Sequence, residues 1–582
     1  MNVKICKVKL IDVIVFFIVK DLKLLVFDSG LRTNEAKVKI IKSLRYINER
    51  IRNKVTLLFC LTCCTLSFVH AADDKPMNIL YIMSDDHATT AIGSYGARLS
   101  ALNPTPTLDK LANKGTLFEN VFVTNSVCTP SRASILTGQY SHINGARNLG
   151  AKLAPEKQFL PLEMKKSGYE TAVIGKWHIS SEPAAFDHYE VLEGQGKYFN
   201  PTFNTKSDVA WPKNQKQYQG HSSDVITDRS LQWLKNRKSD KPFLLLHHFK
   251  APHGMFENAP RYDDYLADVN IPEPKTLFDQ QGWGSIATRG ENDTLRPLIG
   301  SSVSKRHTRN IGKNLKVDQK LSDEAYTKEA YQGYLKRYLR CVKGVDDNIQ
   351  RLLDYLEESG QAENTIVIYS SDQGFMLGEH DLIDKRWMYE ESLRMPLIIY
   401  HPKLKQIKRS KQIINNTDFA PTMLAMAGAE KTPDYMQGYD FSAALTGKKS
   451  SNERQSTYYR YWMHMRHHAN PAHFGIRTEQ YKLIFFYGQP ESTKVKKQKK
   501  KKKPKKQPSK EALALLKGTP VGWELYDINA DPEETINLYN NSEYKAVIKN
   551  LKQELVQLRK DVQENDVDYP HIQQVITQHW ED

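Results

Sequence analysis

Short, nearly continuous apolar runs recur along the first two thirds of the chain, and each one ends in polar residues. They occupy residues 78–83, 168–175, 241–249 and 365–371. Such runs are typical of parallel strands that are buried on both faces of a sheet. The longest helical periodicity covers residues 327–359 and is ended by Gly360. The pattern predicts an α/β domain with a large, mostly parallel sheet sandwiched between helices.

The pattern changes at about Gly447. Four later segments have the composition of antiparallel strands, namely residues 458–462, 474–478, 481–487 and 524–527. A helix over residues 544–562 follows them. The sequence therefore predicts a large α/β domain at residues 73–446 and a smaller α+β subdomain with an antiparallel sheet at residues 447–582.

Residues 1–72 have the features of a presequence. An apolar run at 55–69 follows Arg52 and Lys54 and precedes small residues at 71–72. This is the build of a signal peptide, at about 51–72, and the run is short for a membrane-spanning helix. We expect an exported protein, periplasmic or secreted, without stable membrane insertion. A translation start further downstream would explain the fifty residues before the signal.

The cysteines also fit export without a disulfide scaffold. Of six cysteines, four lie in the presequence, so Cys128 and Cys341 remain in the mature chain. A disulfide between these two stays open as an alternative to a chemical role for Cys128.

The positive charge of the chain is local. The net charge is +16, but residues 1–72 carry 13 Lys and Arg against 5 Asp and Glu, and residues 494–510 carry 11 Lys and no acid. The rest of the chain has a net charge of −3. The lysine tract at 494–510 has no aromatic residue on which a base could stack, so we interpret it as a solvated loop. Binding of a polyanionic polysaccharide, or of nucleic acid, by this tract stays open, but nucleic acid is not expected as the partner of the main function.

Carboxylates follow two of the predicted buried strands. Asp85 and Asp86 follow residues 78–83, and Asp372 and Gln373 follow residues 365–371. In an open α/β sheet, ligands collect at the carboxyl ends of the strands. Neighbouring buried carboxylates are costly unless a cation joins them, and oxygen ligands suit Ca²⁺ or Mg²⁺ better than zinc. We predict a metal site here, with a solvated turn as the alternative.

A candidate nucleophile opens the run Cys-Thr-Pro-Ser-Arg at 128–132, which continues to Leu136, Thr137 and Gly138. The Ser/Thr-rich turn before an apolar run predicts a helix start. A helix N-terminus favours negative charge. A nucleophile there, with Arg132 one helical turn away, suits a sulfate or phosphate ester, whereas a purely structural thiol is the alternative.

Basic residues follow two further predicted strands and a later turn. Lys176 and His178 follow residues 168–175, and His253 follows residues 241–249. Lys385 and His380 lie in the segment after Asp372. Cations and titratable imidazoles would then stand at the same rim as the carboxylates, although each could alone be an ordinary loop residue.

Together these motifs resemble the formylglycine-dependent (type I) sulfatases of the alkaline phosphatase superfamily. The resemblance spans roughly residues 77–540 and includes the complete signature Cys-x-Pro-Ser-Arg followed by Leu-Thr-Gly. It implies an alkaline phosphatase-like fold. It also implies that a maturation enzyme, formylglycine-generating or of the radical type, converts Cys128 into formylglycine (3-oxoalanine).

The resemblance further implies one Ca²⁺ ion, with Mg²⁺ as the less favoured choice. Its ligands would be Asp85, Asp86, Asp372, Gln373 and the modified residue 128. Family members usually have Asn or His where this chain has Gln373, so that position departs from the common pattern.

The family also implies a role for each remaining candidate. Arg132 would orient residue 128, and Lys176 and Lys385 would bind the sulfate. His253 would protonate the departing sugar oxygen, and His178 would deprotonate the second hydroxyl of the aldehyde hydrate. For His380, a position facing the sugar and a purely structural role both stay open.

We therefore predict a sulfuric ester hydrolase that acts on a sulfated polysaccharide or oligosaccharide. Export, a nearly neutral body and a long loop insertion ending near Asp323 favour a glycan substrate. The stretch 371–397 resembles bacterial polysaccharide sulfatases and, more distantly, N-acetylglucosamine-6-sulfatases. An algal polysaccharide such as ulvan is the expected substrate, while carrageenan and glycosaminoglycans are also compatible. A phosphate or phosphonate ester hydrolase and a carbohydrate-binding homologue that is never matured stay open, as does the oligomeric state.

Overall fold

The computed structural model describes residues 76–449, 453–492 and 510–582, together with six single positions between 35 and 46. The predicted signal peptide at 51–72 and the lysine tract, except for Lys510, lie outside the described residues. The chain divides into two units, Met1–Lys75 and Pro76–Asp582, and the following concerns the second unit.

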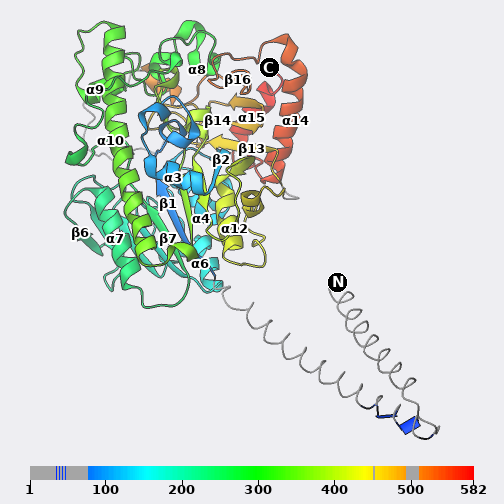
Figure 1. Ribbon diagram of the computed structural model, residues 1–582. Coiled ribbons are helices and arrows are strands. Elements are labelled where there is room, and N and C mark those ends of the chain that lie inside the picture. The colour runs from blue at the N-terminus through cyan, green and yellow to red at the C-terminus, as the bar shows by residue number, and fades with distance from the viewer. Residues whose placement is uncertain are drawn as a thin grey trace, which may run out of the picture. The chain divides into compact units, whose positions relative to one another are not determined.

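A ten-stranded sheet forms the centre of this unit, and its middle strands are parallel. Strand β1 (Asn78–Ser84) lies between β7 (Phe243–His248) and β8 (Thr365–Ser371), and β3 (Glu170–Gly175) lies beyond β7. All four strands point the same way, so their carboxyl ends meet at one edge (Figure 1). These are the four strands that the apolar runs predict.

The outer strands complete a mixed sheet. On one side, β11 (Leu397–Tyr400) runs antiparallel between β8 and β2 (Thr116–Phe122), and β12 (Arg409–Asn415) is the edge. On the other side lie β4 (His188–Leu192), β5 (Thr202–Thr205) and β6 (Gln215–Gln217). The sequence pattern did not predict β4 to β6, because β5 and β6 are short and β6 is exposed and wholly polar.

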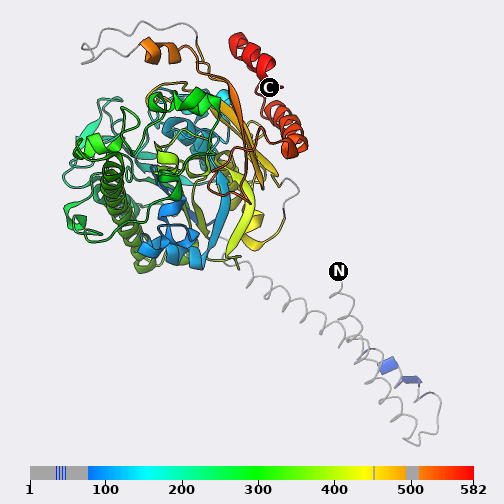
Figure 2. The ribbon, with the colours of Figure 1, turned by 90° about the horizontal axis from the view of Figure 1, so that it is seen from above.

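Helices cover both faces of the sheet (Figures 1 and 2). The long helix α10 (Asp323–Glu358), α7 (Ser222–Asn236) and α3 (Pro106–Lys114) pack with Leu80 and Ile82 of β1. The helices α4 (Cys128–Thr137), α6 (Phe159–Lys166) and α12 (Phe419–Met426) pack with Tyr81 and Met83 on the other face. Adjacent β1 residues thus face opposite cores, as expected for a strand buried on both faces.

A separate four-stranded sheet follows, and all its neighbouring strands are antiparallel. Its strands are β13 (Ser456–Tyr461), β14 (His473–Thr478), β15 (Tyr481–Phe486) and β16 (Gly522–Asp527). One face packs against α14 (Lys545–Asp561) and α15 (Pro570–His579). The other face joins the core of the large sheet through residues such as Ile484 and Phe486. The predicted strands and the helix α14 are confirmed, whereas α15 was not predicted.

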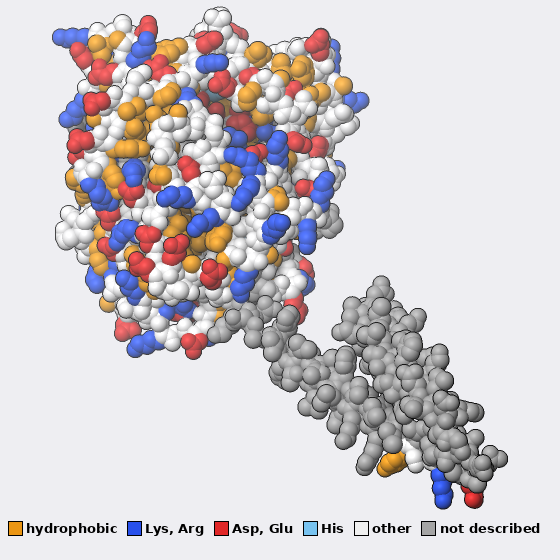
Figure 3. Space-filling view, in the orientation of Figure 1, with side chains coloured by type: hydrophobic (Ala, Val, Ile, Leu, Met, Phe, Trp, Pro, Cys, Tyr) orange, Lys and Arg blue, Asp and Glu red, His pale blue; other side chains and the backbone are white. Residues whose placement is uncertain are grey.

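Residues 254–322 contain only short helices, including α8 (Ile286–Arg289) and α9 (Ile311–Leu315), which agrees with the predicted loop insertion. No helix within the three described ranges is both long and apolar enough to span a bilayer. Basic and acidic side chains are interspersed over the face that Figure 3 shows.

Candidate active site

Carboxylates from two neighbouring strands meet at the carboxyl edge of the sheet. Asp85 and Asp86 directly follow β1, and Asp372 directly follows β8. The backbone N–H of Asp86 donates to Asp372 Oδ1 at 3.1 Å. Each of the three residues offers an oxygen that lies within 4.8 Å of the others, and all three side chains are buried. The structure therefore brings together the acids that the strand ends predict.

The turns that hold these acids are tightly constrained. Asp86 has a left-handed backbone with φ of 69°, a conformation that Asp tolerates better than most residues. Its carbonyl accepts a hydrogen bond from Tyr338 of α10 at 2.7 Å. After Gln373, a side chain at Gly374 would collide with the backbone carbonyls of Glu391 and Arg394. The close approach of these segments requires glycine at that position.

Cys128 is the first residue of α4, as the sequence predicts, and the helix ends at Gly138 with φ of 65°. Its Sγ lies 3.4 Å from Asp85 Oδ1. Ser131 donates a short hydrogen bond to the carbonyl of Asp372, which ties α4 to the end of β8. Cys128 thus lies at a helix N-terminus and directly beside the acids.

Arg132 connects the helix to two strand ends. Its Nε donates to Asp372 Oδ2 at 3.0 Å, and its Nη1 donates to the carbonyl of Lys176 at 2.7 Å. The ammonium of Lys176 forms a short ion pair with Asp85 and donates to Gln195 Oε1 at 2.6 Å. Both cations are buried. A side chain at Gly175 would collide with the carbonyl of His248, so glycine lets β3 deliver Lys176 here.

The remaining basic candidates surround the same point. Lys385 Nζ lies 2.5 Å from Asp86 Oδ2. His253 Nε2 lies 3.8 Å from the same oxygen, and a ring nitrogen of His253 lies within 4.8 Å of Cys128 Sγ. The His178 carbonyl accepts from Thr129, the residue after Cys128, at 2.7 Å. The buried Nδ1 of His178 has no hydrogen-bond partner among the described residues.

Gln373 reaches the acids with the nitrogen of its side-chain amide. Its Nε2 donates a short hydrogen bond to Asp86 Oδ1 and lies 3.8 Å from Cys128 Sγ. Its Oε1 is buried and has no hydrogen-bond partner within the described chain. An orphaned buried carbonyl oxygen is costly unless it binds something. The three acids offer an oxygen donor set that fits a hard cation such as Ca²⁺, and Gln373 would add its oxygen to that set with the amide turned over.

The crowding of charges shifts the proton equilibria. Burial and the neighbouring Asp85 raise the pKa of Asp372 to about 7. Burial likewise raises the pKa of Asp86. Burial also acts to raise the pKa of Asp85, but Lys176, His253 and Arg132 outweigh it and hold that pKa well below its usual value. Clustered acids that resist joint ionisation are expected where a divalent cation binds.

The thiol of Cys128 is not set up as a thiolate. Burial and the nearby Asp85 raise its pKa to about 12. Reactive cysteines have the opposite shift, because the thiolate is the nucleophile. Cys128 and Cys341 are both free and buried, so the alternative of a disulfide between them is wrong. An unmodified thiol at this position is therefore a poor nucleophile.

A cavity of about 430 Å³ opens beside the charged cluster and is lined by His253 and Lys385. Residues that the sequence analysis did not select also line it, namely Gln195, Arg309, Asp384, Arg386, His467 and His468. Asp384 pairs closely with Arg386 and lies 3.6 Å from His468 Nδ1. Because Asp384 and Arg386 flank Lys385 in the sequence, they could have been predicted to lie near the site. Nothing in the sequence connects Gln195 or His468 to it.

The structure does not bring His380 to this cavity. The side chain is 1% exposed. Its ring stacks on Trp283 at 5.0 Å and lies 5.5 Å from Tyr389. The structural role of His380 is therefore supported and the position facing the sugar is not, because the ring is part of an aromatic core.

Comparison with known proteins identifies the class. The sulfatase family model matches residues 77–429, and the model described as the C-terminal part of N-sulphoglucosamine sulphohydrolase matches residues 378–509 and 513–561. The chain belongs to the sulfatase family and is a sulfuric ester hydrolase with an alkaline phosphatase-like fold.

Individual relatives refine this picture. The chain is 37% identical over 560 residues to an N-acetylglucosamine-6-O-sulfatase of Bacteroides thetaiotaomicron, covering 89% of this chain and 92% of that protein. It is 28% identical to an ulvan-active sulfatase of Formosa agariphila, covering 70% and 72%. A solved protein in complex with its substrate D-glucosamine-2-N,6-O-disulfate superimposes with a TM-score of 0.71 at 35% identity, covering 85% of this chain and 100% of that one.

Proposed function

We propose that this sulfatase removes the 6-O-sulfate of a glucosamine-type sugar in a sulfated glycan, using formylglycine at position 128 and one Ca²⁺ ion. The observation that carries the proposal is the buried cluster in which Cys128 touches Asp85 while two ammonium groups and an arginine balance three acids. The N-acetylglucosamine-6-O-sulfatase relative favours this sugar over ulvan, because its identity and coverage are higher.

The charge balance of the cluster explains why a cation and an anionic ester would bind together. Three buried carboxylates face three buried cations, Arg132, Lys176 and Lys385. A divalent cation held by Asp85, Asp86, Asp372, Gln373 and residue 128 would leave the site positively charged. A sulfate ester then supplies the missing negative charge. When bound, the cation would polarise the ester and lower the proton affinity of a hydroxyl at residue 128.

The basic side chains would position the ester. Lys176 and Lys385 already donate to carboxylate oxygens at the rim, and sulfate oxygens are acceptors of the same kind. Each ammonium carries three donors, so it can keep its carboxylate while binding the ester. Arg132, held by Asp372 and the carbonyl of Lys176, would fix residue 128 and stabilise negative charge on it.

The two histidines would move protons. Burial and Lys176 hold the pKa of His253 well below its usual value, and a bound anion shifts it back upward. Protonated His253 would then donate to the departing sugar oxygen as a general acid. Burial and Lys176 lower the pKa of His178 to about 2, so its ring is neutral. A bound anion would raise this pKa as well, and Nδ1, which has no hydrogen-bond partner among the described residues, would then accept a proton from residue 128.

Formylglycine would supply, as its hydrate, one hydroxyl that attacks sulfur and a second whose deprotonation expels sulfate. A maturation enzyme would have to act on Cys128 before it is buried, because the side chain is 1% exposed in the fold. Export through the signal peptide predicted at 51–72 would bring the matured enzyme to its glycan.

The sugar would occupy the cavity of about 430 Å³. Asp384, Arg386 and His468 form a linked set of donors and acceptors on its wall. Such groups suit the hydroxyls of a pyranose ring. Gln195 lines the same cavity and would hold Lys176 toward the ester.

A panel of sulfated sugars tests the proposal. The matured enzyme should release sulfate from N-acetylglucosamine-6-sulfate with a kcat/KM at least tenfold above that for the 3-sulfate, for a galactose-6-sulfate and for ulvan fragments. An aryl phosphate and an aryl phosphonate serve as the comparison for reaction class. Preference for ulvan fragments would overturn the sugar, and preference for phosphorus esters would overturn the reaction.

A further inference from the structure

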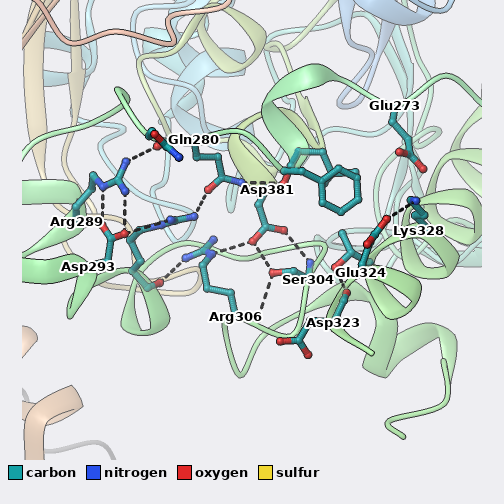
Figure 4. Close-up of a pocket in the computed structure, with 15 residues that line it drawn as sticks. Glu273, Gln280, Arg289, Asp293, Ser304, Arg306, Asp323, Glu324, Lys328 and Asp381 are labelled. Carbon is teal, nitrogen blue, oxygen red and sulfur yellow. Dashed lines mark hydrogen bonds and ion pairs between the residues drawn. The ribbon is translucent and has the colours of Figure 1, made fainter. Parts of the chain in front are cut away.

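A second cavity, of about 830 Å³, lies outside the candidate active site (Figure 4). The insertion 254–322 and the start of α10 form most of its wall. Its charged and polar residues include Glu273, Gln281, Arg289, Asp293, Arg296, Arg306, Glu324, Lys328 and Asp381. None of them has a part in the proposed chemistry.

One side of this cavity is rigid. Arg289 makes two bonds to Asp293, at 2.6 and 2.8 Å. Arg306 donates to Asp381 at 2.9 Å, and Asp381 also accepts from the backbone N–H of Ser304 at 2.7 Å. Figure 4 shows these pairs side by side along the wall. Paired charges of this kind preorganise a surface, because their side chains need no further ordering when a ligand binds.

The other side of the cavity offers side-chain groups that are available to contact a ligand. Among the described residues, no hydrogen bond is made by the carboxylate of Glu273 or the amide of Gln281. The ring of Phe278 is 48% exposed, with Lys328 Nζ 5.9 Å from its centroid. A carboxylate accepts from hydroxyls, an amide both donates and accepts, and an aromatic face covers apolar C–H groups. A sugar ring presents these complementary features.

The charge of the lining argues against a second sulfate. It carries four basic residues (Arg289, Arg296, Arg306 and Lys328) and five acidic ones (Glu273, Asp293, Asp323, Glu324 and Asp381). Each basic residue pairs with an acid of the same wall. Among the described residues, the buried Arg296 Nε and Arg306 Nη2 have no hydrogen-bond partner, so they can donate to the hydroxyls of a sugar. A polyanion would meet the carboxylate of Glu273, which has no ion pair among the described residues, and an excess of acids, so an uncharged sugar fits better.

The two cavities adjoin the same pair of segments, which a backbone bridge joins at Ser302 and Leu382. Ser304 and Arg306 line the second cavity, while Ser301 and Arg309 line the first. Likewise Asp381 lines the second, and Ile383 and Asp384 line the first. The Cα atoms of Asp381 and Ile383 are at most about 7 Å apart, since they are two residues apart. The linings of the two cavities are therefore within the length of one or two sugar units of each other.

We propose that the second cavity is a distal subsite that binds an uncharged hexose or N-acetylhexosamine of the same glycan whose sulfated sugar lies in the active site. This inference rests on the proposed function. It makes the enzyme selective for oligosaccharides over the sulfated monosaccharide. Phe278 supplies the stacking face, and Glu273 and Gln281 bind the hydroxyls.

Kinetics with substrates of different length test the subsite. The substrates are N-acetylglucosamine-6-sulfate and tetrasaccharides in which that sugar carries three uncharged sugars, attached at either end. For wild type, kcat/KM should be about tenfold higher for one of the two tetrasaccharides than for the monosaccharide. Phe278→Ala and Gln281→Ala should each reduce this advantage at least threefold, mainly through KM, and leave the monosaccharide rate unchanged.

Phe199→Ala is the matched control, because Phe199 is 40% exposed and lines neither cavity. It should keep the full advantage of the tetrasaccharide. The subsite is refuted if wild type shows no length dependence, or if both cavity variants retain it. The proposed function fails separately, when neither the monosaccharide nor a tetrasaccharide is desulfated.

Discussion

Replacing Lys385 with alanine removes one of the two buried ammonium groups proposed to hold the sulfate. Its Nζ lies 2.5 Å from Asp86 Oδ2, the side chain is 2% exposed, and the residue lines the substrate cavity. Loss of one preorganised donor at a site of developing charge costs about 10²–10³-fold in kcat, or about 2.7–4 kcal/mol. We expect kcat/KM for N-acetylglucosamine-6-sulfate, measured by sulfate release, to fall by this factor.

The same change also breaks a buried ion pair, which costs about 3–5 kcal/mol of stability because Asp86 loses its partner. Activity must therefore be referred to the folded fraction, measured by circular dichroism and thermal unfolding at the assay temperature. Lys431→Ala is the control, since Lys431 is 75% exposed and pairs with Asp434 at 3.5 Å; it should change neither activity nor stability measurably. A folded Lys385→Ala enzyme with more than a tenth of wild-type kcat/KM would refute the reasoning.

Three further predictions concern positioning, the cation and pH. Gln195→Ala should raise KM about fivefold with kcat nearly unchanged, because Gln195 holds Lys176 Nζ at 2.6 Å; steady-state kinetics identical to wild type would contradict this role. Chelation should abolish sulfate release and lower the Tm, with Ca²⁺ restoring both better than Mg²⁺; an enzyme that stays active after exhaustive chelation would exclude the metal. Burial lowers the pKa of His473 to about 4 from 6.5. The unfolded chain therefore takes up a proton between about pH 6.5 and 4 while the folded chain does not, so stability falls by up to about 3 kcal/mol as the pH drops through this window. His473→Gln should flatten the dependence of Tm on pH there, and an unchanged slope would disprove this contribution.

The middle of the sheet was predictable because each strand there is buried on both faces. Continuous apolar runs identify β1, β3, β7 and β8. The acids that directly follow β1 and β8 indicate where the site lies. The strands β4 to β6 toward one edge of the sheet were not predictable from a continuous apolar run. β6 is a short run of exposed polar residues, Gln215–Gln217, whose strand geometry comes from pairing with β5 rather than from its own composition.

The site residues likewise divide into those that the sequence could predict and those that it could not. Residues at strand ends, such as Asp85 and Lys176, could be predicted to lie close together, because the carboxyl ends of parallel strands share one edge of the sheet. His468 and Gln195 reach the cavity from loops whose course depends on tertiary packing, so spacing along the chain gives no indication of them. His380 is the reverse case. It lies between the predicted site residues Asp372 and Lys385 in the sequence, as a site residue would, but its ring is buried against Trp283.

The central claim, a sulfatase whose nucleophile is a modified Cys128, is tested most directly by relating conversion to activity. Mass spectrometry of the peptide that contains residue 128 gives the fraction of thiol replaced by aldehyde, and sulfate release from N-acetylglucosamine-6-sulfate gives the activity of the same preparation. Across preparations matured to different extents, activity should be proportional to conversion and should vanish for Cys128→Ala. Undiminished sulfate release by unconverted enzyme, or by Cys128→Ala, would contradict the account.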